Sequence, residues 1–180
     1  MPIRAFEDRL PAVDATAYVD PAAVVIGDVV IGRDSSLWPT AVARGDIQAI
    51  RIGAETNIQD GSVLHVTHDS GYCPGGLGVR VGDGVTVGHR AILHACTIED
   101  GALIGMGSVI MDGAVVGARC LVGAGSVVPP GRRLEGGWLW LGSPVRRVRR
   151  LRREELEFLE YSARHYVTLK ERHRQARSAT

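Results

Sequence analysis

An aliphatic or small residue recurs at every sixth position through most of the chain. The series begins at Val13 and reaches Val128 with two breaks and a one-residue slip. Its members are Val13, Val19, Val25, Ile31, Leu37, Ala43, Ile52, Ile58, Leu64, Val81, Val87, Leu93, Ile98, Ile104, Ile110, Val116, Val122 and Val128. A period of six fits neither an amphipathic helix nor an alternating strand, but it suits a β-solenoid with one inward side chain per short strand. The sequence therefore predicts an all-β parallel solenoid over residues 1–135, with three strands per coil of about 18 residues.

Composition agrees with a repeat architecture and excludes several partners. The chain has 23 glycines and only 5% aromatic residues, a bias typical of short repeats with tight turns. Its formal net charge of +1 gives no electrostatic footprint for nucleic acid or for a membrane surface. No targeting segment or membrane-spanning stretch is recognisable, so we expect a cytoplasmic protein. Because the three cysteines form no CxxC pair, we expect Cys96 and Cys120 to be buried small side chains rather than disulfide or zinc ligands.

The repeat pattern stops after Val128, and residues 136–180 are predicted to form a turn and a C-terminal helix packed on the solenoid. The helix is expected from about residue 153. Its apolar stripe has spacings of three and four, and consists of Leu156, Leu159, Ala163, Tyr166 and Val167. A dense basic run precedes it, with Arg146, Arg147, Arg149, Arg150, Arg152 and Arg153. Acidic residues follow this run directly, so we interpret it as a solvated or subunit-contacting strip rather than a nucleic-acid site.

Two histidines occupy equivalent positions in consecutive coils. His65 follows the inward Leu64, and His94 follows the inward Leu93. If the coils pair as parallel strands, these histidines lie on one face about 4.8 Å apart and both point outward. Arg44 stands in the same position one coil earlier. Protonated imidazoles stacked beneath an arginine would repel one another, whereas a bound cation that requires neutral imidazole removes this conflict.

A third histidine is placed around a corner of the coil. His89 comes two residues after Val87, in line with Asp60 two residues after Ile58. It cannot easily reach the ion held by the first pair within one chain, but a symmetric trimer can lay this face against the histidine pair of a neighbour. Three neutral nitrogens with an open fourth position are typical of catalytic zinc. The alternative is a set of surface histidines with one acting as a base. His68, in the loop that interrupts the repeat, and the helical His165 and His173 have no such support.

Three segments carry a more specific resemblance. The stretches ARGD (43–46), NIQDGSVLH (57–65) and GHRAILHACTI (88–98) are similar to those of the gamma-class carbonic anhydrase family, and the similarity extends over nearly the whole chain. The resemblance implies a left-handed parallel β-helix, a homotrimer, and hydration of carbon dioxide to bicarbonate by a hydroxide generated at the metal. It implies His65, His89 and His94 as ligands of Zn²⁺, or of Fe²⁺ or Co²⁺ in some members.

The same resemblance assigns further roles. Gln59 matches the residue that orients the reacting water, and Arg44 matches one that pairs across the interface with an aspartate matching Asp46. Asp60 matches a polar residue at the rim of the site.

The chain departs from the family in residues that relay protons. Ile47 stands where founding members have a glutamate, and the loop VTHDSGYCPGGLG contains a single acid, Asp69. His68 or Tyr72 could substitute. Three functions therefore compete: a carbonic anhydrase, then a slow or inactive metal-binding trimer or thioester hydrolase, and finally a hexapeptide acyltransferase that would use one histidine as its base.

Overall fold

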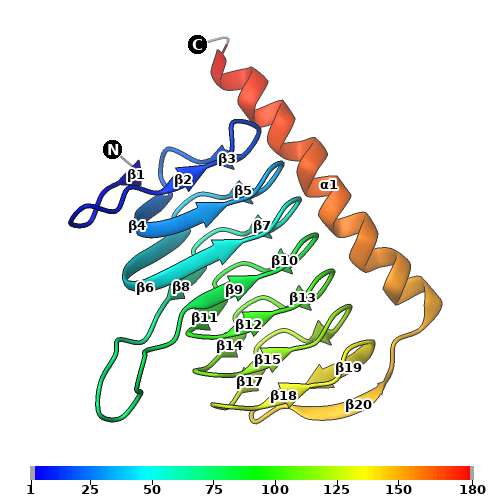
Figure 1. Ribbon diagram of the computed structural model, residues 1–180. Coiled ribbons are helices and arrows are strands. Elements are labelled where there is room, and N and C mark those ends of the chain that lie inside the picture. The colour runs from blue at the N-terminus through cyan, green and yellow to red at the C-terminus, as the bar shows by residue number, and fades with distance from the viewer. Residues whose placement is uncertain (1–2, 179–180) are drawn as a thin grey trace.

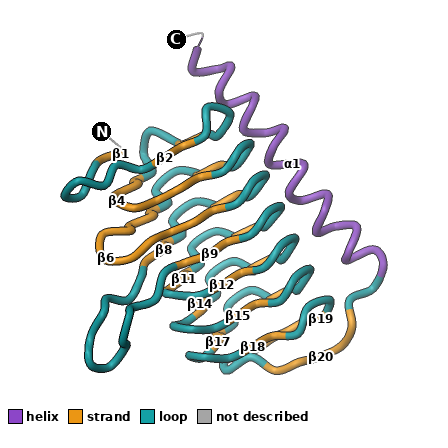
Figure 2. Tube along the Cα trace, in the orientation of Figure 1, coloured by secondary structure: helices purple, strands orange, loops and turns teal. Residues whose placement is uncertain are grey.

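The six-residue repeat folds into a stack of coils, each built from short parallel strands, and the C-terminal helix runs along one side of the stack (Figure 1). The computed structural model describes residues 3–178. This arrangement confirms the parallel β-solenoid predicted from the repeat. Figure 2 shows the strands separated by turns that line up along the edges of the stack.

The strands form three faces, which we number in chain order within a coil. Face 1 consists of β2 (Ala12–Val13), the second halves of β4 (Val24–Ile31) and β6 (Val42–Ile52), β9 (Val79–Val81), β12 (Thr97–Ile98), β15 (Val115–Val116) and β18 (Arg133–Leu134). Face 2 consists of β3 (Tyr18–Val19), β5 (Ser36–Leu37), β7 (Asn57–Ile58), β10 (Thr86–Val87), β13 (Leu103–Ile104), β16 (Leu121–Val122) and β19 (Trp138–Leu141). Face 3 consists of β1 (Ile3–Arg4), the first halves of β4 and β6, β8 (Val63–His65), β11 (Ile92–His94), β14 (Val109–Ile110) and β17 (Val127–Val128).

The predicted inward residues form the core. From Val25 to Val128 every member of the series is at most 3% exposed. They stack in register, so that Ile58 pairs with Val87 and Val87 with Ile104. Cys96 and Cys120 are buried, as expected. Val13 and Val19 are only partly buried, because they belong to the first coil of the stack.

The solenoid extends further than the repeat indicates. β18 continues the stack beyond Val128, and β19 carries it past residue 135, with Leu134 and Trp140 buried as inward residues. The segment predicted as a turn contains β20 (Arg146–Arg150), which pairs antiparallel with β19. An uncovered last strand would expose unpaired backbone groups, and β20 covers this one.

The basic run is paired within the chain. Arg147 and Arg150 lie over the ring of Trp138, 4.3 and 4.5 Å from its centroid. Arg149 makes a two-pronged contact with Glu155, at 2.7 and 2.8 Å, the geometry in which a guanidinium binds a carboxylate most firmly. These contacts fix the connection between the solenoid and the helix.

Helix α1 (Arg153–Ser178) covers part of face 2. Leu159 and Ala163 are buried, and Leu156, Tyr166 and Val167 are half-buried, which confirms the predicted stripe. Figure 1 shows the helix returning from the last coil to the first, so that β1 and the end of α1 lie near one end of the stack. There the fully buried Lys170 donates to the Thr16 carbonyl at 2.7 Å and to Asp34 at 2.8 Å. No helix within residues 3–178 combines the length and apolarity needed to cross a membrane.

Candidate metal centre

A row of polar side chains runs across three neighbouring strands of face 3. Arg44 of β6 is the register partner of His65 of β8, and His65 is the partner of His94 of β11. All three follow a buried inward residue and therefore point away from the core. The structure thus places the two histidines one above the other, as the repeat predicts.

The two imidazoles present ring nitrogens to each other. Nδ1 of His65 lies 3.2 Å from Nε2 of His94. Two nitrogens bound to one tetrahedral zinc at about 2.0–2.1 Å are about 3.3 Å apart. The observed spacing therefore fits two ligands of a single tetrahedral ion.

The other nitrogen of each ring faces a carboxylate. His65 Nε2 lies 3.3 Å from Asp46 Oδ1, and His94 Nδ1 lies 2.7 Å from Asp112 Oδ1. A carboxylate only accepts hydrogen bonds, so each neutral ring carries its proton on the side facing its aspartate. The facing nitrogens then both hold lone pairs, and a cation between them would satisfy both.

Electrostatics at the pair favour a neutral His65 ring and ionised carboxylates. Burial of the ring, and next the Arg44 guanidinium, lower the pKa of His65 below its ordinary value. Burial alone would raise the pKa of Asp46, but the Arg44 hydrogen bond and further contacts outweigh it, and the net shift is downward. Asp112 behaves in the same way: burial opposes ionisation, while hydrogen bonds from Thr67 and His94 hold its pKa below the ordinary value. Neutral imidazole is the form that binds a metal.

Arg44 and Asp46 form an ion pair within this chain. Asp46 thereby contacts both the arginine and His65. Gly45, between them, lies so close to β4 that a β-carbon there would come 2.7 Å from the carbonyl oxygen of Asp28. The absence of a side chain at Gly45 therefore lets β6 pass β4 at the point where Asp46 turns toward the histidines.

His89 occupies a different edge of the solenoid. It lies in the turn between β10 and β11, and its Nδ1 is 2.8 Å from Asp60 Oδ2. The predicted alignment of His89 with Asp60 is thus observed. The contact leaves Nε2 of His89 as the nitrogen able to bind a metal. Among residues 3–178 of one chain, no three histidine, cysteine or acidic side chains are grouped so that they could hold an ion together.

Gln59 begins a buried polar chain that ends on the helix. Its Nε2 donates to Asn57 Oδ1 at 3.0 Å, and Asn57 Nδ2 donates to Thr86 Oγ1 at 3.0 Å. Thr86 Oγ1 is in turn 3.0 Å from the hydroxyl of Ser162. Gln59 itself is 6% exposed. Its amide is therefore held in one orientation by residues of β7, β10 and α1.

Comparison with known proteins shows which family this chain resembles. Residues 95–130 match the family described as "Bacterial transferase hexapeptide (six repeats)". Protein YrdA of Escherichia coli is 50% identical over 169 residues, covering 94% of this chain and 92% of YrdA. Gamma carbonic anhydrase 1, mitochondrial, of Arabidopsis thaliana is 45% identical over 92% of this chain and 60% of the plant protein. The chain belongs to the gamma-carbonic-anhydrase-like hexapeptide-repeat family.

A solved structure of similar sequence and fold is described as a different kind of protein. A putative acetyltransferase from Bacillus cereus superposes with a TM-score of 0.90 at 34% identity, over 97% of each chain. The fold is therefore shared with a protein described as a putative acetyltransferase.

The loop that interrupts the repeat lies between β8 and β9 and projects from the stack (Figure 1). Its one acid, Asp69, accepts a hydrogen bond from the backbone of Gly75 at 2.8 Å and so shapes the loop. His68 is exposed, and Tyr72 at the tip is fully exposed. Asp69 is thus engaged in holding the loop's own backbone.

Sequence reasoning missed Asp112 and Thr67. Asp112 lies 18 residues after His94, in the next coil, and contacts its ring. That spacing is one coil length, so the six-residue register could have indicated an acid near His94. Thr67 donates to the other oxygen of Asp112 across 45 residues of sequence. The loop interrupts the register there, and no sequence signal would have found this contact.

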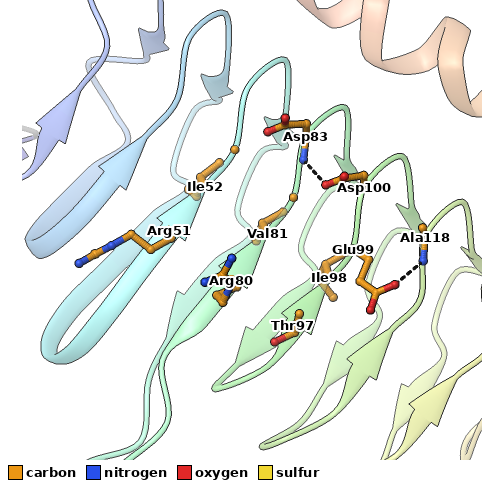
Figure 3. Close-up of a pocket in the computed structure, with 12 residues that line it drawn as sticks. Arg51, Ile52, Arg80, Val81, Asp83, Thr97, Ile98, Glu99, Asp100 and Ala118 are labelled. Carbon is orange, nitrogen blue, oxygen red and sulfur yellow. Dashed lines mark hydrogen bonds between the residues drawn. The ribbon is translucent and has the colours of Figure 1, made fainter.

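A groove of about 430 Å³ on face 1 lies apart from the histidines (Figure 3). Its carboxylates serve the turns of the solenoid: Asp100 accepts from the backbone of Asp83 at 2.9 Å, and Glu99 accepts from the backbone of Ala118 at 2.9 Å. None of the residues that line it is a histidine. Face 3 therefore remains the candidate centre.

Proposed function

We propose that the protein is a carbonic anhydrase-like metalloenzyme that hydrates carbon dioxide at sites between the subunits of a homotrimer. His65 and His94 of one copy and His89 of another would hold a divalent ion, with Zn²⁺ first and Fe²⁺ or Co²⁺ as alternatives. The observation that carries the proposal is the 3.2 Å separation of the two facing nitrogens, each ring being oriented by a carboxylate.

An apolar stripe beside the histidine row supports assembly with further copies. Aliphatic side chains point outward at one register position of face 3, and they are Val42, Val63, Ile92, Val109 and Val127. Ile92, next to the histidines, is 41% exposed in the single chain. A continuous aliphatic stripe left open is typical of a surface that a partner covers. A second copy would bring its own His89 to that surface in a closed symmetric ring.

The residues around the proposed metal site would have separate roles in the reaction. When bound, the metal would supply the Lewis acidity that makes water a nucleophile near neutral pH. Gln59, fixed by Asn57, would orient the reacting water through its amide. Asp60 and Asp46 would keep the protons of His89 and His65 on the nitrogens away from the ion. Arg44, whose side chain is 43% exposed, would offer positive charge to the departing bicarbonate.

The test combines metal content with turnover. Elemental analysis of protein purified without added metal should give about one ion per chain, and stopped-flow assay of the same sample should show carbon dioxide hydration. His94→Ala should lose both. His68→Ala, at an exposed loop histidine, is the matched control and should keep the metal. No metal in the wild-type protein, even after reconstitution, would overturn the proposal.

A slower member of the same class is the second candidate. Asp69 is held by Gly75, and Ile47 is 43% exposed where founding members have an acid. Proton transfer to solvent would then limit turnover. Stoichiometric metal with little hydration, rescued by added imidazole buffer, would identify this case.

Acyl transfer from a thioester is favoured by one observation, the likeness to the putative acetyltransferase from Bacillus cereus. That chemistry needs one histidine as a base and no bound ion. Transfer that survives chelation and His94→Ala but is lost in His65→Ala would replace the proposed function.

A further inference from the structure

Both oxygens of the Asp112 carboxylate are engaged by side chains from other coils. Oδ1 accepts from His94 Nδ1 at 2.7 Å, and Oδ2 accepts from the hydroxyl of Thr67. The first contact has the length of a charge-assisted hydrogen bond. The Asp112 carboxylate is therefore held by two hydrogen bonds, so it can restrict the orientation of the His94 ring.

The contacts form a closed circuit around the candidate centre. Thr67 comes two residues after His65, and its backbone pairs in both directions with Leu77 at 2.9 Å, at the base of the loop. His65 faces His94, His94 donates to Asp112, and Asp112 accepts from Thr67. The strand that carries one histidine is thus tied to the group that orients the other.

The circuit restricts a side chain that is otherwise free to turn. The last torsion of a histidine is broad and nearly two-fold, so an unrestrained ring presents either nitrogen. A carboxylate at Nδ1 selects the tautomer and the rotation in which Nε2 faces outward from that contact.

His65 is held less tightly than His94. Its contact with Asp46 is longer, at 3.3 Å, and Asp46 is shared with Arg44. Removal of Asp112 should therefore disturb the pair more than any other carboxylate change on this face.

We propose that Asp112 and Thr67 are positioning residues that lock His94 with its proton on Nδ1 and its Nε2 toward His65. This inference rests on the proposed function, because the locked ring is the one that would bind the metal. Asp112 acts directly on the ring, and Thr67 acts through Asp112.

The first measurement is zinc affinity by chelator competition. Asp112→Ala should weaken binding about 10- to 100-fold, the usual effect of removing a carboxylate behind a ligating histidine. Thr67→Val should weaken it by a smaller factor. Asp112→Asn, whose amide oxygen still accepts from Nδ1, should recover much of the loss. Asp69→Ala removes a nearby carboxylate that touches no histidine and should leave the affinity unchanged.

The second measurement is independent of metal. Nitrogen-15 NMR of the histidine rings in metal-free protein should show His94 protonated on Nδ1 in the wild type and a mixture of tautomers in Asp112→Ala. Unchanged His94 shifts together with unchanged zinc affinity would overturn the inference. If the Asp112 variants fail to fold, Thr67→Val gives the same two readouts. A wild-type protein that binds no zinc would instead defeat the proposed function, while the tautomer measurement would still decide whether Asp112 orients the ring.

Discussion

Faces 2 and 3 of the solenoid have the same strand geometry, but their outward chemistry differs where the helix crosses face 2. Where α1 crosses face 2, the residues preceding the inward positions of β5, β7 and β10 are Ser36, Asn57 and Thr86, and all three are buried. Further along the face, beyond the helix contacts, these positions hold Leu103 and Leu121. On face 3 the corresponding positions hold Val63 and Ile92, which are partly or largely exposed. The polar part of face 2 is thus covered by the chain's own helix, and the aliphatic stripe of face 3 is left open in the single chain.

The contrast follows from how each kind of surface recognises a partner. Hydrogen bonds are directional, so Thr86 and Lys170 fix one register of α1 on the solenoid. Aliphatic burial is non-directional and grows with area, so a long stripe suits a flat contact with another copy. Polar contacts thus fix the register of the chain's own helix, and under the proposed function the apolar stripe would contact another copy.

The largest effect is expected from a charge placed in the open stripe. Ile92→Glu would bury an unpaired carboxylate in each subunit contact, at a cost of about 3 kcal/mol per contact. Light scattering coupled to size exclusion should show monomers, and bound metal should fall with them. Val30→Glu is the matched control, since Val30 is 38% exposed but lies on face 1. Equal oligomer mass for both variants would contradict the assignment of face 3 as the interface.

A smaller effect is expected where the helix is anchored. Lys170 is the one lysine of the sequence and its side chain is fully buried. Lys170→Met removes its contacts to the Thr16 carbonyl and Asp34, which should destabilise the end of α1 by about 2 kcal/mol. Hydrogen exchange should quicken in the helix while face 3 stays protected. Arg164→Met, on the exposed side of α1, serves as the control, and equal exchange in both variants would show that Lys170 is not the anchor.

A subtler change tests the polar chain beneath the helix. Thr86→Val keeps the shape of the side chain but loses the hydrogen bonds with Asn57 and Ser162. Unfolding free energy should fall by about 1 kcal/mol. If the proposed function holds, hydration should also slow, because Gln59 depends on Asn57 for its orientation. Thr168→Val, which loses only a contact to the backbone of its own helix, should affect neither measurement.

The smallest effect is a pH dependence of helix docking. The hydrogen bond from Lys170 holds the pKa of Asp34 below its ordinary value of 3.8 and likewise lowers that of Glu171. Because the folded-state values are depressed, this stabilisation is present above about pH 4–4.5 and is lost as the pH falls through the folded values. After correction for the intrinsic exchange rate, which itself falls on acidification, the protection of α1 amides should decrease as the pH is lowered in the wild type, and Lys170→Met should remove much of that change. If Lys170→Met showed the same pH dependence of exchange as the wild type, Lys170 would be excluded as the source of that dependence.

The sequence was informative wherever a residue's position in the repeat decided its environment. The inward series located the core, and the same register stacked His65 on His94 and aligned His89 with Asp60. The apolar stripe of the helix was likewise visible from its spacing. Each of these results depends on backbone periodicity alone, which local sequence sets.

Other features depended on contacts that cannot be read from the six-residue repeat. The sequence by itself determined the solenoid, the direction in which the histidines point, and the presence of the helix. Only the tertiary structure decided that residues 146–150 return as β20, that Lys170 is buried, and that Asp112 and Thr67 close a circuit around His94. These depend on side-chain rotamers and on an inserted loop that breaks the register. Their partners therefore become neighbours only once the coils are stacked.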